Sequence, residues 1–177
     1  MKVITAKRWA PEFYDQYYDD AEILRLCEKR EKAESKWTQA TLKVSGKMGS
    51  SHGCKVTSED STAGGGRSDQ RWVRNNASII FIEHENRPED LSSELAKLCN
   101  DVSVLNVLLT YVADRDFTAN LEQIKKQVGK AIRDHIGSFV GELLLMVSGY
   151  NEEDWVAYSF VVKSRKCNVR SIRLPKD

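Results

Sequence analysis

The chain of 177 residues suits one domain, residues 1–177, with enough length to bury a core. Hydrophobic residues make up 41% of it and charged residues 30%, as in soluble globular proteins. No apolar run approaches the roughly 18 residues that cross a bilayer, so we expect no membrane-spanning helix and no membrane partner.

The net charge of +1 hides an uneven distribution of charge. The stretch from Glu12 to Glu22 is acidic, whereas the stretch from Lys163 to Lys176 carries six Lys and Arg residues and no Asp or Glu. A basic segment of this kind can contact nucleic acid, although most such segments are simply solvated.

The four cysteines, Cys27, Cys54, Cys99 and Cys167, are widely spaced and form no Cys-x-x-Cys pair. The N-terminal residues lack the long apolar stretch of a signal peptide. We therefore expect reduced thiols and an intracellular, cytoplasmic protein.

The first third of the chain is predicted to hold one helix, one strand and one loop. Apolar residues at helical spacing predict a helix from Pro11 to about Ser35. The residues from Trp37 to Met48 are rich in β-formers and predict a strand. The polar, glycine-rich stretch from Gly49 to Gly66 predicts a long loop, and loops of this length are usually functional or disordered.

The middle of the chain predicts a hairpin followed by a βαβ unit. Two strand-like stretches, Arg67–Val73 and Ala77–Glu85, flank Asn75-Asn76, and asparagine tolerates the left-handed conformations of tight turns. A helix at Pro88–Asn100 and a buried strand at Val104–Val112 follow. Short links of this kind predict parallel strands with a right-handed crossover.

The last third predicts a helix at Thr118–Ile136 and strands at Phe139–Val147 and Trp155–Val162. Together the elements predict the α/β class, with a central mixed β-sheet flanked by helices. We expect Leu95 and Leu108 in its interior.

Carboxylates follow the apolar run Ile79–Ile82, whose composition is that of a strand buried on both faces. Because side chains alternate along a strand, Glu83 and Glu85 point to one side and His84 to the other. Two carboxylates repel each other at the end of a buried strand, and a cation such as Mg²⁺ would relieve the repulsion. Alternatively, the strand ends at Ile82 and both carboxylates are solvated. The predicted hairpin would bring Asp69 close to the pair.

This order of elements, with an acid on one strand and an acid-x-acid pair on the next, resembles the restriction-endonuclease-like, or PD-(D/E)xK, nuclease superfamily. The resemblance covers roughly Glu12 to Val112. It implies a restriction-endonuclease-like core in which Asp69 and Glu83 hold Mg²⁺ or Mn²⁺. Glu85 would orient or deprotonate a water molecule, or ligate a second ion.

The sequence departs from the family pattern in one respect, since Glu85 stands where the motif usually has Lys. A lysine from another element could replace it, and Lys43 and Lys97 are candidates, although each is more often a plain surface residue. Glu34 could turn inward toward the site or remain on a solvated helix face. His84 is expected to be structural.

The resemblance implies a metal-dependent DNA endonuclease of the restriction or repair type, acting on DNA as a homodimer or with a partner subunit. The glycine-rich loop and the basic segments Lys43–Lys55 and Lys163–Arg173 could track the phosphate backbone. A non-catalytic α/β interaction module and an inactive nuclease-fold subunit of a larger complex are the alternatives.

Overall fold

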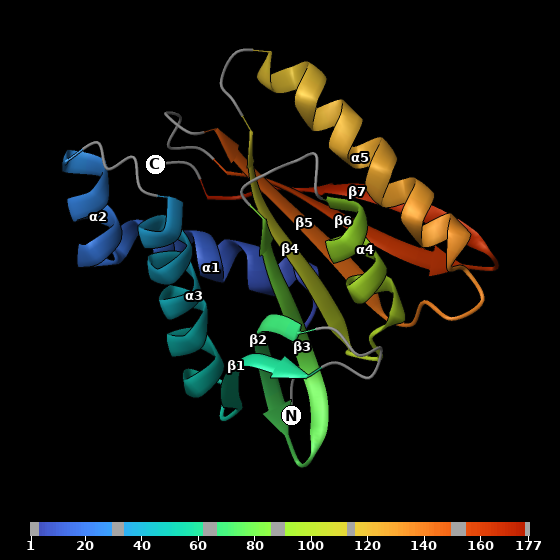
Figure 1. Ribbon diagram of the computed structural model, residues 1–177, viewed down its shortest axis with the longest axis horizontal. Helices are drawn as coiled ribbons and strands as arrows, with labels where there is room; N and C mark the ends of the chain where they lie inside the picture. Colours follow the sequence, from blue (N-terminus) through green and yellow to red (C-terminus); the bar gives the residue numbers. More distant parts are fainter. Residues whose placement is uncertain are drawn as a thin grey trace.

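The computed structural model describes residues 4–29, 34–61, 67–85, 91–112, 116–149 and 155–175, and a seven-stranded mixed sheet runs through its centre (Figure 1). The strands lie side by side in chain order: β1 (Lys55–Ser61), β2 (Arg67–Arg74), β3 (Ala77–Glu85), β4 (Leu105–Val112), β5 (Glu142–Gly149), β6 (Val156–Lys163) and β7 (Lys166–Ile172). The neighbours β3, β4 and β5 are parallel, and the other neighbours are antiparallel.

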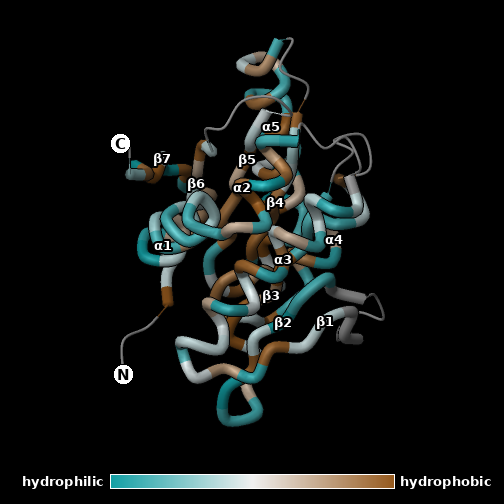
Figure 2. Tube along the Cα trace, turned by 90° about the vertical axis from the view of Figure 1, so that its left-hand side faces the viewer, coloured by the Kyte–Doolittle hydropathy of each residue, from teal (hydrophilic) through white to brown (hydrophobic). Residues whose placement is uncertain are grey.

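Helices cover both faces of this sheet, which confirms the predicted α/β class. In the described part of the chain they are α1 (Ala6–Asp19), α2 (Ala21–Glu28), α3 (Glu34–Ser51), α4 (Leu91–Asn100) and α5 (Phe117–Asp134). Figure 1 shows α1 and α3 on one side of the central strands and α4 and α5 on the other. The apolar side chains therefore form two hydrophobic cores, one on each face of the sheet. The strand interiors are the most hydrophobic part of the chain (Figure 2).

Side-chain alternation assigns each strand residue to one of these two cores. Ile80, Ile82 and Leu109 pack with α1 and α3, whereas Phe81 and Leu108 pack with α4 and α5. Every residue of β4 is buried, as expected for a parallel strand covered on both faces. Leu95 and Leu108, predicted to be interior, are buried in the α4–α5 core.

The predicted hairpin and βαβ unit are confirmed. The antiparallel strands β2 and β3 are joined through Asn75 and Asn76, which both have positive φ, at 52° and 61°. The helix α4 connects the parallel strands β3 and β4. The prediction for residues 86–90, including Pro88, lies outside the described residues.

The prediction of one helix from Pro11 to Ser35 is wrong. The chain forms α1, α2 and the start of α3 there, and α1 begins at Ala6, ahead of Pro11. The break lies at Asp20, whose backbone is extended and whose side chain accepts hydrogen bonds from the backbone N–H groups of Glu22 and Ile23. Aspartate at this position caps the new helix by satisfying two N–H groups that have no partner within it.

The prediction of a strand at Trp37–Met48 is also wrong, because these residues form most of α3. Ala40, Val44 and Met48 recur every four residues and are buried, which is helical spacing. Thr41 and Ser45 occupy the same face and are also buried. The β-forming composition was outweighed by this packing.

Contacts with the sheet hold α3 close to β1 and β2. The Gln70 side-chain oxygen accepts hydrogen bonds from the hydroxyl of Ser45 and the indole of Trp72, and its amide donates to the carbonyl of Leu42. Gly49 has no side chain, and a Cβ there would lie 2.5 Å from Val56 and 2.9 Å from Trp72. The helix can therefore approach the sheet only with glycine at this position.

The long loop predicted at Gly49–Gly66 is partly wrong, since α3 continues to Ser51 and β1 occupies Lys55–Ser61. Residues 62–66 lie outside the described residues. The prediction also missed β7, an edge strand whose mostly exposed residues carry no apolar alternation. No helix in the described ranges is both long and apolar enough to cross a membrane.

Candidate functional site

The candidate site lies at the end of β3, where Glu83 is buried with 1% of its surface exposed. The strand continues to Glu85, so the alternative in which it ends at Ile82 and leaves Glu83 solvated is wrong. The alternation of β3 directs Glu83 to the α4 side of the sheet and His84 to the α3 side, as expected.

Asp69 reaches this site from the neighbouring strand β2. Its carboxylate oxygen Oδ2 accepts a hydrogen bond of 2.7 Å from the backbone N–H of His84. Its charge also acts on Glu83. The hairpin register therefore brings Asp69 close to Glu83, as the predicted hairpin implied.

Two residues of α4 complete the cluster. The ammonium of Lys97 lies 2.6 Å from Oε2 of Glu94 and 3.7 Å from Oε2 of Glu83. The second oxygen of Glu83, Oε1, is buried and receives no hydrogen bond from the described residues. We call Asp69, Glu83, Glu94 and Lys97 the acid cluster.

The acid cluster changes the protonation of Glu83. Burial raises the pKa of Glu83 to about 10, and a hydrogen bond to the Glu94 carboxyl and the charges of Asp69 and Glu94 add to the rise. The charge of Lys97 lowers the pKa of Glu83, but by less than these effects raise it. Glu83 is therefore protonated at neutral pH in the protein alone.

Lys97 keeps its charge in this setting. Burial alone would lower its pKa, but the hydrogen bond to Glu94 and the charges of Glu83, Glu94 and Asp69 raise the pKa overall. A lysine held protonated in this way can neutralise an anion but cannot act as a base at neutral pH.

The other two acids predicted at the site are Glu85 and Glu34. Glu85 is half-buried at the last position of β3, on the same side as Glu83 and opposite Thr110 of β4. Glu34 is the first residue of α3, and its side chain lies outside the described part of the structure.

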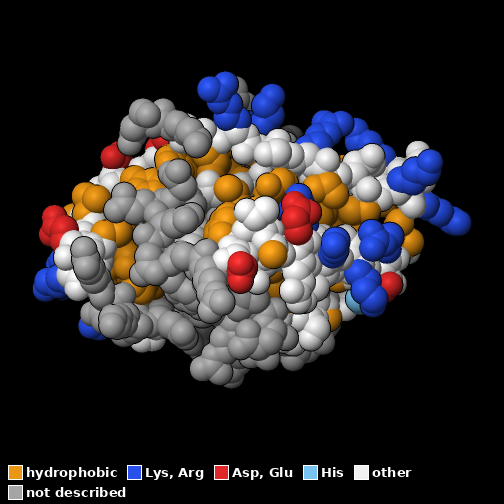
Figure 3. Space-filling view, turned by 90° about the horizontal axis from the view of Figure 1, so that it is seen from above, with side chains coloured by type: hydrophobic (Ala, Val, Ile, Leu, Met, Phe, Trp, Pro, Cys, Tyr) orange, Lys and Arg blue, Asp and Glu red, His pale blue; other side chains and the backbone are white. Residues whose placement is uncertain are grey.

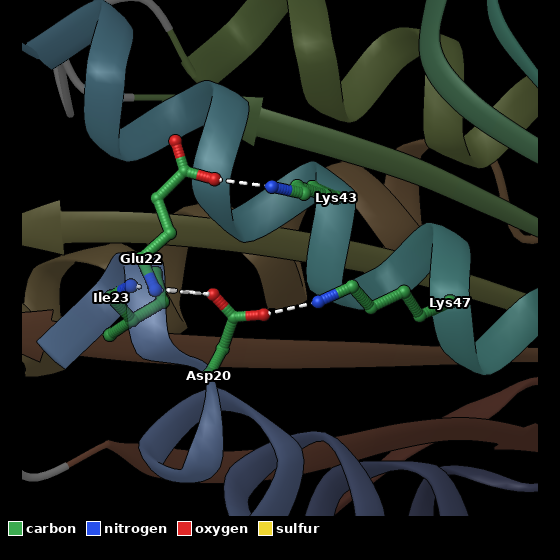
Figure 4. Close-up of polar contacts among 5 residues, drawn as sticks. All are labelled: Asp20, Glu22, Ile23, Lys43 and Lys47. Carbon is green, nitrogen blue, oxygen red and sulfur yellow. Dashed lines mark hydrogen bonds and ion pairs between the residues drawn. The ribbon is translucent and has the colours of Figure 1, made fainter.

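Lys43 is not brought to the acid cluster. It lies on α3 instead of the predicted strand, and its ammonium pairs with Glu22 at 2.5 Å on the exposed surface. Next to it, Lys47 pairs with Asp20, the residue that caps α2 (Figure 4). These two lysines attach α3 to the start of α2.

His84 belongs to a buried polar chain on the opposite face. Its Nδ1 lies 3.3 Å from the hydroxyl of Thr38, and its ring packs against Tyr111 at 5.4 Å. The Tyr111 hydroxyl lies 3.2 Å from the hydroxyl of Thr41 and 3.5 Å from that of Tyr17. Burial lowers the pKa of His84 to about 4, so its ring is neutral and structural at neutral pH.

The sequence interpretation missed Glu94. The signal was present in the helical spacing, because Leu91, Leu95 and Leu98 form the buried face of α4. Glu94 and Lys97, three residues apart, border that face on one side.

The acid cluster offers an incomplete metal site. No group of three or more His, Cys, Asp or Glu side chains among the described residues is arranged to hold a metal ion. Mg²⁺ nevertheless binds in many sites through one or two carboxylates, with water and phosphate oxygens as the other ligands. The unpartnered Oε1 of Glu83 and the nearby carboxylate of Asp69 fit that smaller set.

Comparisons with known proteins add no functional argument. No family model matches the chain, and no curated protein matches it. Among solved structures, the central domain of yeast acetyl-CoA carboxylase aligns with a TM-score of 0.29 and 12% identity. That alignment covers 72% of this chain, which spans only 25% of the other, and likeness at this level carries no argument.

Proposed function

We propose that this protein is a metal-dependent DNA endonuclease with a restriction-endonuclease-like core, in which the acid cluster is the active site. The observation that carries the proposal is the convergence of Asp69, Glu83 and Lys97 from three consecutive elements. An isolated carboxylate would be solvated, whereas these side chains are drawn together in a largely buried site.

The order of elements supports the same proposal. A helix, three antiparallel strands, a crossover helix and a parallel strand follow one another as α3, β1, β2, β3, α4 and β4. This is the order on which the resemblance to the nuclease superfamily rests, although its helix and first strand are other segments of the chain than the predicted ones.

Lys97 would take the place of the lysine missing from the acid-x-acid motif. It comes from α4 instead of β3, yet its ammonium lies within 3.7 Å of the first motif glutamate. A protonated lysine here would neutralise charge on a phosphate and orient the attacking water. Glu85, at the rim of the site, is the residue that would accept a proton from that water.

Asp69 and Glu83 would hold Mg²⁺ or Mn²⁺. Such an ion supplies Lewis-acid stabilisation of phosphate charge and lowers the pKa of bound water. Glu83 must lose its proton to act as a ligand, so binding of the ion would release a proton to solvent. The four free cysteines fit the cytoplasmic setting that a DNA substrate would suggest.

The experiment compares cleavage of plasmid DNA with Mg²⁺ or Mn²⁺ by the wild type, Glu83→Gln and Lys97→Met. Loss of cleavage is expected in both variants, with their folds retained. Glu122→Gln and Lys43→Met alter exposed residues outside the acid cluster and should cleave like the wild type. Equal cleavage by all of these proteins would refute the assignment of the site.

An inactive nuclease-fold subunit is the second candidate. One observation favours it: without a metal ion most of the charge in the acid cluster is already offset, because Glu83 is protonated and Lys97 pairs with Glu94. Absence of cleavage by the wild type on every DNA tried, together with no calorimetric binding of Mn²⁺, would favour this candidate.

A further inference from the structure

Basic side chains gather at the end of α5 and at the tip of the β6–β7 hairpin. All are exposed, and they are Lys126, Lys130, Arg133, Lys163, Arg165 and Lys166, which together we call the basic end. Figure 3 shows Lys and Arg side chains concentrated toward the side of the molecule where α5 ends and β7 lies. The three from α5 recur at helical spacing and so form one outward stripe.

The two parts of the basic end adjoin each other. The helix α5 packs on β7, and the charge of Arg133 acts on Cys167, directly after the hairpin tip. Farther back along α5, the ammonium of Lys125 lies 4.4 Å from the ring centre of Tyr158 on β6. The stripe on α5 therefore runs on to the hairpin tip as one surface.

The turn at the hairpin tip places an arginine in a left-handed backbone conformation, which arginine adopts less readily than asparagine or glycine. Ser164 and Arg165 form the turn with φ of 51° and 58°, both left-handed. The equivalent turn between β2 and β3 uses Asn75 and Asn76, which tolerate this conformation far better than arginine does. Strain retained at an exposed arginine points to a use for its side chain.

We propose that the basic end is a docking surface for the phosphate backbone of duplex DNA. Six cations lie within two adjoining elements, and the segment from Lys163 to Arg173 contains no Asp or Glu. Asp134, on the last turn of α5, pairs with Lys130. A surface of this charge complements the regularly spaced phosphates of a duplex.

The composition of the surface favours a duplex over a single strand. Proteins that bind single strands stack bases on exposed aromatic rings. None of the exposed residues described in α5 and the β6–β7 hairpin is aromatic, and Lys125 covers Tyr158. A two-stranded ribbon enters the major groove of B-DNA but not the deep, narrow groove of an RNA duplex, which favours DNA.

The choice of DNA rests on the proposed function, and the sheet geometry makes the two sites compatible. Pairing across the sheet sets Glu83 level with Tyr158, three strands away. Lys163 lies five residues beyond Tyr158, so it is roughly 17 Å along the strands and about 14 Å across them from Glu83. The separation of roughly 22 Å equals the length of about six or seven base pairs, which is shorter than the duplex used in the test below.

The test measures binding of a labelled duplex of about 24 base pairs by fluorescence anisotropy, with a chelator present and between about 50 and 200 mM salt. The hairpin variant carries Lys163→Gln, Arg165→Gln and Lys166→Gln. We expect its affinity at low salt to fall by about tenfold or more and the salt dependence, as a log–log slope, to weaken by about 2 to 3. A helix variant with Lys126→Gln, Lys130→Gln and Arg133→Gln repeats the test on the other element.

A matched control removes three exposed cations elsewhere, on α1 and at α2, with Lys7→Gln, Arg25→Gln and Lys29→Gln. It should bind within about twofold of the wild type. Equal weakening by the control, unchanged binding by both basic-end variants, or equal competition from single-stranded DNA or an RNA duplex would overturn the proposal. Stronger binding to vesicles containing phosphatidylserine than to the duplex would do the same. Because the chelator prevents cleavage, failure of the nuclease proposal would not alter these results.

A single substitution separates a binding role from a structural one. Arg165→Gly removes both the charge and the strain, so thermal stability should rise while affinity for the duplex falls about threefold. Asn76→Gly, at the equivalent position of the other turn, should leave affinity unchanged. A rise in stability with no loss of affinity for Arg165→Gly would show that the arginine does not contact DNA.

Discussion

At the scale of single residues, Glu83 links the candidate site to the stability of the fold. Its pKa is about 10 in the folded protein, mainly because it is buried, and about 4.3 in an unfolded chain. Between these values the folded state holds a proton that the unfolded state has lost. Stability is therefore lost as pH rises through this window.

Replacing Glu83 with glutamine should stabilise the metal-free protein, and the gain should grow with pH. Its upper limit is about 1.4 kcal/mol for each pH unit within the window. Urea unfolding of both proteins at pH 7 and pH 9 measures the difference. This range avoids His84, whose lowered pKa makes stability fall only as pH drops below about 6.5. An equal gain at both pH values would contradict a raised pKa at Glu83.

At the scale of elements, the contact of α3 with β1 and β2 depends on glycine. A methyl group at Gly49 would collide with Trp72, which is fully buried, and with Val56, which packs against the same core. Gly49→Ala should therefore destabilise the protein by about 1–3 kcal/mol, although alanine is the better helix former. Gly137→Ala is the matched control, because nothing lies within 4 Å of its added methyl. Equal midpoints in thermal unfolding for the two variants would show that α3 packs less closely than described.

The same helix shows where prediction from sequence reaches its limit. Elements whose partners are near in the chain were predictable: the asparagine turn fixed the register of β2 and β3 and so brought Asp69 to Glu83. The residues of α3 have a β-forming composition, which predicted a strand. They form a helix because they pack on β1 and β2, and their own pattern does not show that packing. Glu94 was missed although the spacing of Leu91, Leu95 and Leu98 shows which face of α4 is buried, because the strand residue that Glu94 meets depends on where the helix packs on the sheet.

At the scale of the whole molecule, the sheet is the layer shared by the two hydrophobic cores, one on each of its faces. Trp9, Trp72 and Trp155 are buried in the α1–α3 core, and Trp37 packs against it. Leu108 lies in the α4–α5 core on the far side. Tryptophan fluorescence therefore reports on the α1–α3 core, whereas Leu108 belongs to the α4–α5 core.

Leu108→Ala should lower stability by about 2–5 kcal/mol, and tryptophan fluorescence should record the full loss. The reason is that β4 contributes to both cores, so neither face can melt alone. Denaturation followed by fluorescence and by far-ultraviolet circular dichroism should give one midpoint. A fluorescence midpoint equal to that of the wild type would mean that the two faces unfold independently.

The position of α1 has a consequence for the order in which the protein can form during translation. The backbone N–H of Ala6 donates to the carboxylate of Glu142, 136 residues later, and α1 packs on β5, β6 and β7. A ribosome adds roughly 5–20 residues each second, so Ala6 is made roughly 7 to 27 seconds before Glu142. During that interval Trp9, Phe13 and Tyr17 lack the cover that β5, β6 and β7 give them in the folded protein. The nascent chain therefore leaves α1, the most aromatic of the described helices, partly uncovered until β5, β6 and β7 are complete, and a chaperone can bind it in that interval.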